Sequence, residues 1–325
     1  MMKMKKINYK QFLIENSALA TLLILLIVGT AIMGTTFLSI PNFRNILLNN
    51  AIIGIIALGM TLVIISGGID LSVGSATAAA GLFAIWTMNM TGSIVVGILG
   101  AMAVGALMGA FNGVLVAKFG IPAFIVTLGA MQIFRSLSLH FFRGGGILIA
   151  GEVNWFLNIS NTRIFFDILP LPVIYWLVLA AIVGFIAKNT AFGRHVYAVG
   201  SSERAANLSA IKVDRVKVYV YMLCGLLVSL AAVVEASRLG SMNSASSGGF
   251  YELNAIAAVV IGGTAMSGGR GRIVGTVFGT LTLGVINNVM NLMGLPSFLV
   301  GAIQGSIVIL AVLLQRSVEK KTKQF

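Results

Sequence analysis

The chain has 325 residues, of which 58% are hydrophobic and only 10% are charged, and its formal net charge at pH 7 is +13. Soluble domains carry about 25% charged residues, so this composition excludes an ordinary soluble protein, including a basic soluble DNA-binding protein. A chain that is both apolar and basic indicates an integral membrane protein whose cations lie outside the bilayer core.

Stretches with no charged residue, or with only one, predict ten membrane-spanning helices. A helix that crosses a bilayer needs about 20 mostly apolar residues. Residues 71–117 and 273–315 are each long enough for two helices, with breaks near 89–93 and 291–296. The predicted fold is therefore an all-α, polytopic transmembrane bundle. Its spans lie within residues 18–38, 46–66, 71–117, 121–142, 168–187, 218–237, 253–269 and 273–315.

The distribution of Lys and Arg predicts the orientation of these spans. With the N-terminus placed in the cytoplasm, 17 of the 22 cations fall on the cytoplasmic side, as the positive-inside rule requires. We therefore expect a cytoplasmic basic segment at 1–17, a transmembrane domain at 18–315 with a cytoplasmic loop at 188–217, and a cytoplasmic basic tail at 316–325. Both termini are expected in the cytoplasm. The cations outside that set are Arg135, within a span, and Arg44, Arg143, Arg163 and Arg238 on the outer side.

Glycine is abundant within the predicted spans. Gly105, Gly109 and Gly113 are spaced by four, which gives a smooth helix face and favours tight helix packing over a sliding surface. One short sequence pattern occurs twice: Ser-Gly-Gly-x4-Val-Gly is found at 66–74 and again at 267–275. Either an internal repeat or two unrelated glycine-rich turns explains this match.

Motifs for catalysis and for metal or nucleotide binding are lacking in the sequence. It contains no G-x-x-x-x-G-K-[ST] loop for a nucleotide and no recognisable nucleophile–base pair. With Cys224, His140 and His195 as the only cysteine and histidines, no zinc cluster is expected. We therefore predict neither an enzyme, nor a cofactor, nor a metal site. Carboxylates lie near span ends rather than within spans, so no proton or sodium relay is evident.

The loop 188–217 is the largest cytoplasmic segment and carries six cations. Ser202 is placed to cap a short helix over 202–211, with Glu203 in its first turn. The small side chains of Ala205, Ala206 and Ser209 would share one helix face. Such a helix suits a groove on a partner, although a solvated basic loop is an equal alternative.

Several stretches resemble the ribose/galactoside-type permease subunits of bacterial ABC sugar importers. The resemblance runs in order along nearly the whole chain. It rests on residues 66–75 (SGGIDLSVGS), 193–200 (GRHVYAVG), 203–209 (ERAANLS), 251–264 (YELNAIAAVVIGGT) and 268–276 (GGRGRIVGT).

This resemblance implies a multi-pass protein of the bacterial inner membrane with several partners. The protein partners are an ATPase subunit, a periplasmic or lipid-anchored sugar-binding protein, and a second permease copy in a homodimer or pseudo-dimer. The chain is also expected to contact membrane lipid, and no nucleic acid is expected as a partner. It also implies that 200–211 is the coupling helix that receives the ATPase stroke. Ala210 stands where the family pattern leads us to expect glycine, which a left-handed helix cap favours. The coupling residues expected on this basis are Gly200, Ser202, Glu203, Ala205, Ala206 and Ser209.

The implied mechanism is alternating access, in which weak polar contacts guide a monosaccharide, ribose or a similar pentose or hexose. The favoured lining residues are Asn254 and the adjacent pair Asn287 and Asn288. For each amide, a hydrogen bond between helices is the alternative role. The complete set of pathway candidates is Asp70, Ser72, Asn112, Gln132, Glu252, Asn254, Asn287, Asn288 and Gln304.

Two other functions stay open at this point. One is a stand-alone, ion-coupled secondary sugar transporter. The other is a permease of the same family for a nucleoside or another small polar ligand. The sequence does not distinguish a homodimer from a heterodimer, nor does it name the sugar.

Overall fold

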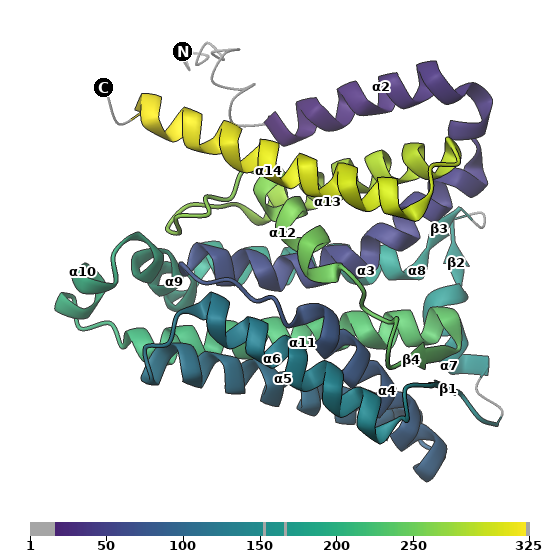
Figure 1. The fold of residues 1–325 in the computed structure, drawn as a ribbon, viewed down its shortest axis with the longest axis horizontal. Helices are drawn as coiled ribbons and strands as arrows, with labels where there is room; N and C mark the ends of the chain where they lie inside the picture. The colour runs from purple at the N-terminus through teal and green to yellow at the C-terminus, as the bar shows by residue number, and fades with distance from the viewer. Residues whose placement is uncertain (1–16, 152–153, 166–167, 323–325) are drawn as a thin grey trace, which may run out of the picture.

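The computed structural model describes residues 17–151, 154–165 and 168–322, and the predicted segment 1–17 therefore lies outside it except for Ser17 (Figure 1). Ten helices correspond in order to the ten predicted spans, which confirms the helical bundle. They are α2 (Ser17–Phe37), α3 (Ile40–Ile65), α4 (Val73–Thr91), α5 (Ile94–Lys118), α6 (Ala123–Phe141), α8 (Leu171–Asn189), α11 (Val213–Leu239), α12 (Tyr251–Ile261), α13 (Ile273–Leu292) and α14 (Ser297–Thr322).

Seven helices in the described part of the chain are long and apolar enough to cross a membrane. These are α2, α3, α5, α6, α8, α11 and α13; α12 and residues 298–307 of α14 are shorter apolar helices. Helix α3 is the centre of the bundle. In its apolar stretch 83% of the residues are buried, whereas in α2, at the edge, only 17% are. The core forms where α3 packs against α8, α11, α12 and α13.

Some predicted boundaries were wrong, and the helix ends explain why. Helix α3 begins at Ile40 rather than at 46, because the Ser39 side chain caps it and Pro41 fits its first turn. Helix α11 begins at Val213 rather than at 218, so its first turns include charged residues that lie at the end of the bundle. Helix α12 ends at Ile261 rather than at 269, and residues 262–272 form a connection without helix.

The predicted breaks within the two longest runs are present. Gly92 ends α4 in a left-handed conformation, with φ 66°, and Ser93 caps α5. Gly294, with φ 68°, and Pro296 separate α13 from α14. Glycine at a helix end and proline before the next helix are the residues that such turns require.

The glycine series on α5 packs tightly against α11. A Cβ at Gly105 would overlap the Gly225 carbonyl, and one at Gly109 would overlap the Tyr221 carbonyl. At Gly113 it would lie 2.8 Å from the Val218 Cα. The two helix backbones therefore approach closely along this face, as the tight-packing interpretation predicts.

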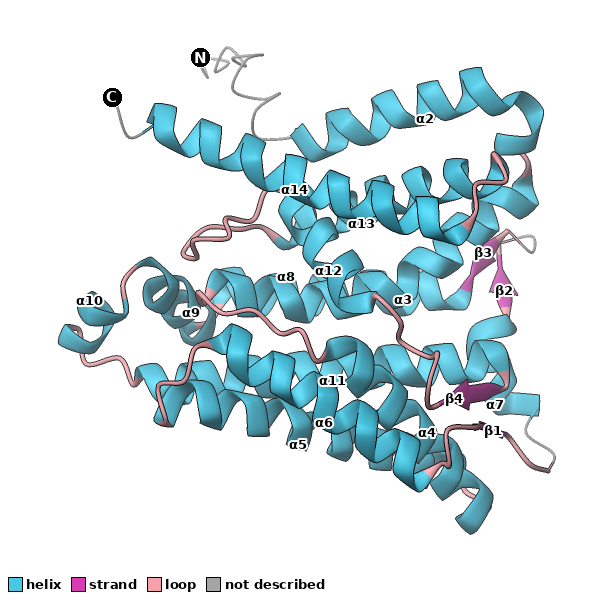
Figure 2. Cartoon of the chain, in the orientation of Figure 1, coloured by secondary structure: helices cyan, strands magenta, loops and turns pink. Residues whose placement is uncertain are grey.

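The sequence did not predict several small elements at the two ends of the bundle. Figure 2 shows two short antiparallel strand pairs and α7 (Asn154–Asn161) at one end. Strands β1 (Gly146–Leu148) and β4 (Ser241–Asn243) form one pair, and β2 (Arg163–Ile164) and β3 (Leu169–Pro170) form the other.

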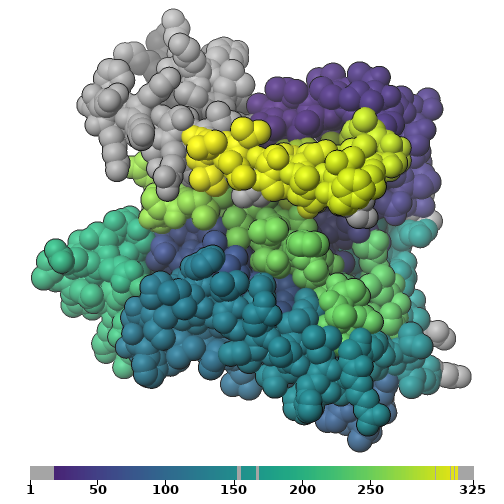
Figure 3. Space-filling model, viewed as in Figure 1, coloured from purple at the N-terminus to yellow at the C-terminus, as the bar shows by residue number. Residues whose placement is uncertain are grey.

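The opposite end carries α9 (Ala191–Ser201) and α10 (Glu203–Leu208), which we call the α9–α10 arm (residues 190–212). In the space-filling view the arm protrudes beyond the rest of the bundle (Figure 3). Helix α2 begins and α14 ends at this same end of the bundle (Figure 1). The first and the last of the described residues therefore lie at the same end of the bundle.

Candidate functional site

The α9–α10 arm contains two short helices where one was predicted. Thr190 caps α9 by accepting a hydrogen bond from the Gly193 amide at 3.1 Å. Ser202 caps α10, as predicted, and its Oγ accepts from the Ala205 amide at 3.2 Å. Helix α10 ends at Leu208 rather than at 211, and Gly200 belongs to α9. The Ser202 cap interrupts the helix because its extended backbone changes the chain direction.

The end of α10 adopts the left-handed cap despite the alanine. Ala210 has φ 59°, the Ile211 amide donates to the Ala206 carbonyl, and the Ala210 amide donates to the Asn207 carbonyl. These two bonds are the pair that defines a Schellman cap, which usually has glycine at this position. The left-handed conformation is unfavourable for an L-residue by about 1–2 kcal/mol.

The small residues of the arm do not share one outward face. Ala206 is buried in the main core, with 3% exposure, so a partner cannot reach it in this structure. Ala205 and Ser209 are exposed. Leu208 was not among the residues expected from the sequence. It is an apolar residue at the tip of α10, and 86% of its surface is exposed. Its apolar character within a charged loop was the signal that could have identified it.

The backbones of four glycines meet where the arm contacts the bundle, and we call this contact the glycine junction (Gly67, Gly200, Gly268 and Gly269). A Cβ at Gly200 would overlap the Ile65 carbonyl. The same carbonyl accepts a hydrogen bond from the Gly269 amide at 2.8 Å. A Cβ at Gly268 would lie 2.8 Å from the Gly200 carbonyl oxygen and 3.1 Å from the Gly67 Cα. The two Ser-Gly-Gly turns therefore meet each other and α9 at one point.

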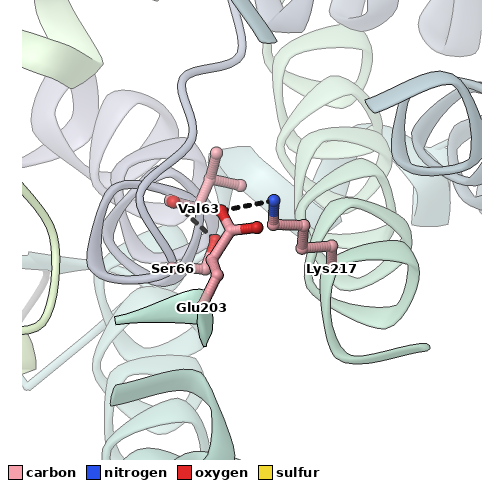
Figure 4. Close-up of polar contacts among 4 residues, drawn as sticks. All are labelled: Val63, Ser66, Glu203 and Lys217. Carbon is pink, nitrogen blue, oxygen red and sulfur yellow. Dashed lines mark hydrogen bonds and ion pairs between the residues drawn. The ribbon is translucent and has the colours of Figure 1, made fainter. Parts of the chain in front are cut away.

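A polar cavity of 460 Å³ lies beside the junction. Its walls include Ser66 and Gly67, the 116–123 region, Tyr221, and the charged side chains of Glu203, Asp214 and Lys217. The Lys217 ammonium forms an ion pair with Glu203 at 2.6 Å, which connects α10 to α11 (Figure 4). In the same view the Ser66 hydroxyl donates to the Val63 carbonyl, at 2.7 Å.

Asp70, Ser72 and Asn112, three predicted pathway residues, are brought together in a buried cluster. The Asp70 Oδ1 accepts from the Ser72 amide at 2.9 Å and from the Ser72 hydroxyl at 2.6 Å. The Asn112 amide donates to the Ser72 Oγ at 2.8 Å. All three residues are 1–3% exposed, so they line no open passage in this conformation. Burial raises the pKa of Asp70, which lies between α3 and α4, and these hydrogen bonds oppose the shift.

The connection between α3 and α4 (residues 66–72), which contains Asp70 and Ser72, is held by a second contact. The Tyr221 hydroxyl on α11 donates to the Ile69 carbonyl at 3.0 Å. Tyr221 also borders the 460 Å³ cavity. Residues 66–72 thus lie between an open polar space and buried polar groups.

Four of the remaining predicted pathway residues, which are all amides, divide into two sets. Asn254 and Gln304 line a mostly apolar groove of 680 Å³ between α12 and α14, and the Gln304 amide donates to Asn287 at 2.9 Å. Asn288 instead exchanges two hydrogen bonds with Asn42 on α3, at 2.6 and 3.0 Å. Adjacent amides on α13 therefore face different neighbours, and the Asn288 pair holds helices together.

Other polar groups near the strand-bearing end have local partners. The Arg135 guanidinium on α6 donates to the carbonyls of Ser244 and Ser247, at 2.8 and 3.0 Å. It thereby fixes the loop that leads from β4 to α12. Glu252 is half-buried near Gly74, and Gln132 is exposed on α6.

Comparison with known proteins places the chain in a family. The family model described as "Branched-chain amino acid transport system / permease component" matches residues 42–313. The ribose import permease protein of Escherichia coli strain K12 is 40% identical over 314 residues, covering 94% of each chain. The ribose import permease protein of Bacillus subtilis strain 168 is 41% identical and covers 90% of each.

A relative with a different sugar in its name is also similar. The L-arabinose ABC transporter permease protein of Azospirillum brasilense is 33% identical over 311 residues, covering 94% of this chain and 88% of the relative. No solved structure matches the chain. The chain belongs to the branched-chain amino acid transport system / permease component family.

Proposed function

We propose that this chain is the membrane permease subunit of an ABC importer that moves a monosaccharide, ribose or a similar sugar, across the bacterial inner membrane. The observation that carries the proposal is similarity over at least nine tenths of both chains to permeases named for ribose import. Similarity to permeases named for xylose and L-arabinose supports the substrate class rather than one sugar.

The α9–α10 arm is the proposed docking site of the ATPase subunit. It protrudes from the end of the bundle and presents Ser202, Glu203, Ala205, Leu208 and Ser209 at the surface. An exposed leucine at the tip, surrounded by small and polar residues, fits an apolar pocket on a partner. Gly200 and Ala206 act on the inner side of the arm, where they set how closely it packs against the bundle.

The glycine junction would transmit a displacement of the arm. Because Gly200 touches both the Ile65 carbonyl and the Gly268–Gly269 turn, α9 cannot move without moving the connections on either side. One of these connections, 66–72, carries the Asp70 cluster and borders the polar cavity. A stroke delivered to α10 would therefore displace residues 66–72, and we propose that this displacement opens or closes the sugar path at the arm end of the bundle.

The groove between α12 and α14 is the proposed part of the sugar path that a second permease copy completes. It offers the amides of Asn254 and Gln304 on an apolar wall, which suits weak and transient contacts with sugar hydroxyls. A sugar-binding protein would deliver the substrate at the end that carries the strand pairs. Homodimeric assembly and both partners are parts of this proposal.

Co-purification of the ATPase subunit tests the docking assignment. Leu208→Ala removes the exposed side chain, and we expect it to weaken ATPase association about tenfold while the chain inserts normally. The control is Leu148→Ala, because Leu148 is 74% exposed at the other end of the bundle. Equal ATPase recovery with L208A and the unmodified chain would contradict the assignment.

A further inference from the structure

A second cavity at the arm end of the bundle is lined by basic residues from three separate elements. It has a volume of 590 Å³ and lies between α8, α9 and the start of α13. Lys188 comes from the last turn of α8, Arg194 from α9, and Arg272 from the residue that precedes α13. No carboxylate is among the described residues that line it. We call this cavity the basic pocket.

A hydrogen bond between two walls of the basic pocket holds its cations in fixed relative positions, so the pocket is not a chance gathering of surface charges. The Tyr197 hydroxyl donates to the Gly271 carbonyl at 2.8 Å, which ties α9 to the 262–272 connection and fixes Arg194 relative to Arg272. The remaining walls are small or apolar, and they include Gly184, Ile273 and Val274. All three cationic residues are exposed, so their charged groups are available to a ligand.

The pocket lies where two apolar helices end, which is where lipid headgroups are expected. Helix α8 ends and α13 begins there, and both are long and apolar enough to cross a membrane. The side chains that continue from the pocket along these helices are apolar and exposed: Val274 is 59% exposed and Phe185 61%. A ligand would therefore meet positive charge at the boundary and apolar surface immediately next to it.

These features match an anionic phospholipid. Basic pockets between spanning helices hold phosphate headgroups, and the acyl chains lie along the adjacent apolar helix surface. At the start of α13, no side chain caps the first-turn amide groups, and they add a favourable field for a phosphate oxygen. An acidic surface of a partner protein would pair with the three cations, but it would not contact the exposed apolar side chains of Val274 and Phe185, which would still face lipid.

We propose that the basic pocket binds the headgroup of an anionic phospholipid, with Lys188, Arg194 and Arg272 contacting the phosphate. The lipid would join α8 to the α9–α10 arm and to the 262–272 connection at the membrane boundary. This assignment does not depend on which sugar the protein carries.

Lipid titration followed by native mass spectrometry tests the proposal on the purified full-length chain. Each cation removed near an anionic headgroup weakens binding about fivefold. We expect R194Q/R272Q to lower the affinity for phosphatidylglycerol about 20-fold, and R194K/R272K to retain it within about threefold. The matched control is R204Q/K212Q, which removes two exposed cations of the arm that lie outside the pocket. Phosphatidylcholine should bind all four proteins equally weakly.

Four results would overturn the proposal. Equal weakening in R204Q/K212Q would mean diffuse surface charge, and equal binding of phosphatidylcholine would mean that headgroup charge is irrelevant. Displacement of the lipid by an excess of inorganic phosphate would indicate a free-anion site. Loss of ATPase co-purification in R194Q/R272Q with unchanged phosphatidylglycerol binding would indicate a protein contact. If R194Q/R272Q does not fold, K188Q takes its place, with an expected weakening of about fivefold.

Discussion

Ala210 holds a backbone conformation that glycine adopts at no steric cost. Its φ of 59° completes the cap of α10, and both cap hydrogen bonds are formed around it. The alanine therefore makes the arm less stable than the same cap would be with glycine.

Replacing this alanine gives a residue-scale prediction. Ala210→Gly should stabilise the arm by about 1 kcal/mol, because it relieves the left-handed strain. Amide hydrogen exchange of residues 202–211 should slow about fivefold. As a control, Ala205→Gly lies within α10, where glycine disfavours the helix, and exchange should become faster. Faster exchange in A210G would show that the cap is not strained.

At the scale of elements, the arm is attached to the bundle by backbone contacts that only glycine permits. The Gly200 contact with Ile65 and with the 267–269 turn leaves no room for a methyl group. The Lys217–Glu203 ion pair adds a second link, but Glu203 is exposed, so this pair contributes about 0–1 kcal/mol. The glycine junction is therefore a direct backbone contact between the arm and the Ile65–Gly67 segment, beside the Tyr197–Gly271 hydrogen bond and the buried side chain of Ala206.

A methyl group at the junction should separate docking from transport. Gly200→Ala displaces α9 from Ile65 while leaving the outward face of α10 unchanged, so ATPase co-purification should persist and sugar uptake should fall at least about tenfold. The control is Gly129→Ala on α6, where a Cβ would meet nothing within 4 Å. Wild-type uptake by G200A would refute transmission through the junction.

Most helices of the bundle could be predicted because their ends are chemically marked. Long runs with few or no charged residues locate α2 to α6, and Gly92 and Pro296 mark the internal breaks. The start of α3 was misplaced because Arg44 lies within a helix near its end, where charge is tolerated. The strand pairs were not predicted, because β1 and β4 are three residues each and pair across more than 90 residues of sequence.

The candidate site was harder to predict than the fold, for a geometric reason. Spacing on a single helix put Ala205, Ala206 and Ser209 on one face, but the chain turns at Ser202 and buries Ala206 against the core. Asp70 and Asn112 are 42 residues apart, and only the packing of α5 against the 66–72 connection brings them together. The pairing of Asn42 with Asn288 depends on tertiary contacts in the same way.

For the whole molecule, the two ends of the bundle carry different structures. One end holds the arm, the polar cavity and the basic pocket, and the other holds α7 and both strand pairs (Figures 1 and 2). The cations gather at the arm end, which the positive-inside rule assigns to the cytoplasm. Under the proposed function, this orientation would put the ATPase and the sugar-binding protein at opposite ends of the bundle.

Side-specific labelling checks this orientation. The native Cys224 is buried, so a cysteine introduced at the surface is the reactive one. In intact cells, a membrane-impermeant maleimide should label Leu148→Cys but not Ser209→Cys, and permeabilisation should make Ser209→Cys reactive. Labelling of Ser209→Cys before permeabilisation would reverse the orientation and remove the basis for ATPase docking on the arm.

The central claim is that ATP hydrolysed by a partner drives sugar through this chain. The most direct measurement is the initial rate of ribose uptake into proteoliposomes that contain the chain, its ATPase and its sugar-binding protein. We predict uptake that requires all three proteins and ATP, and none when the chain alone is given a proton or sodium gradient. Uptake by the chain alone under an ion gradient would contradict the account and identify a secondary transporter.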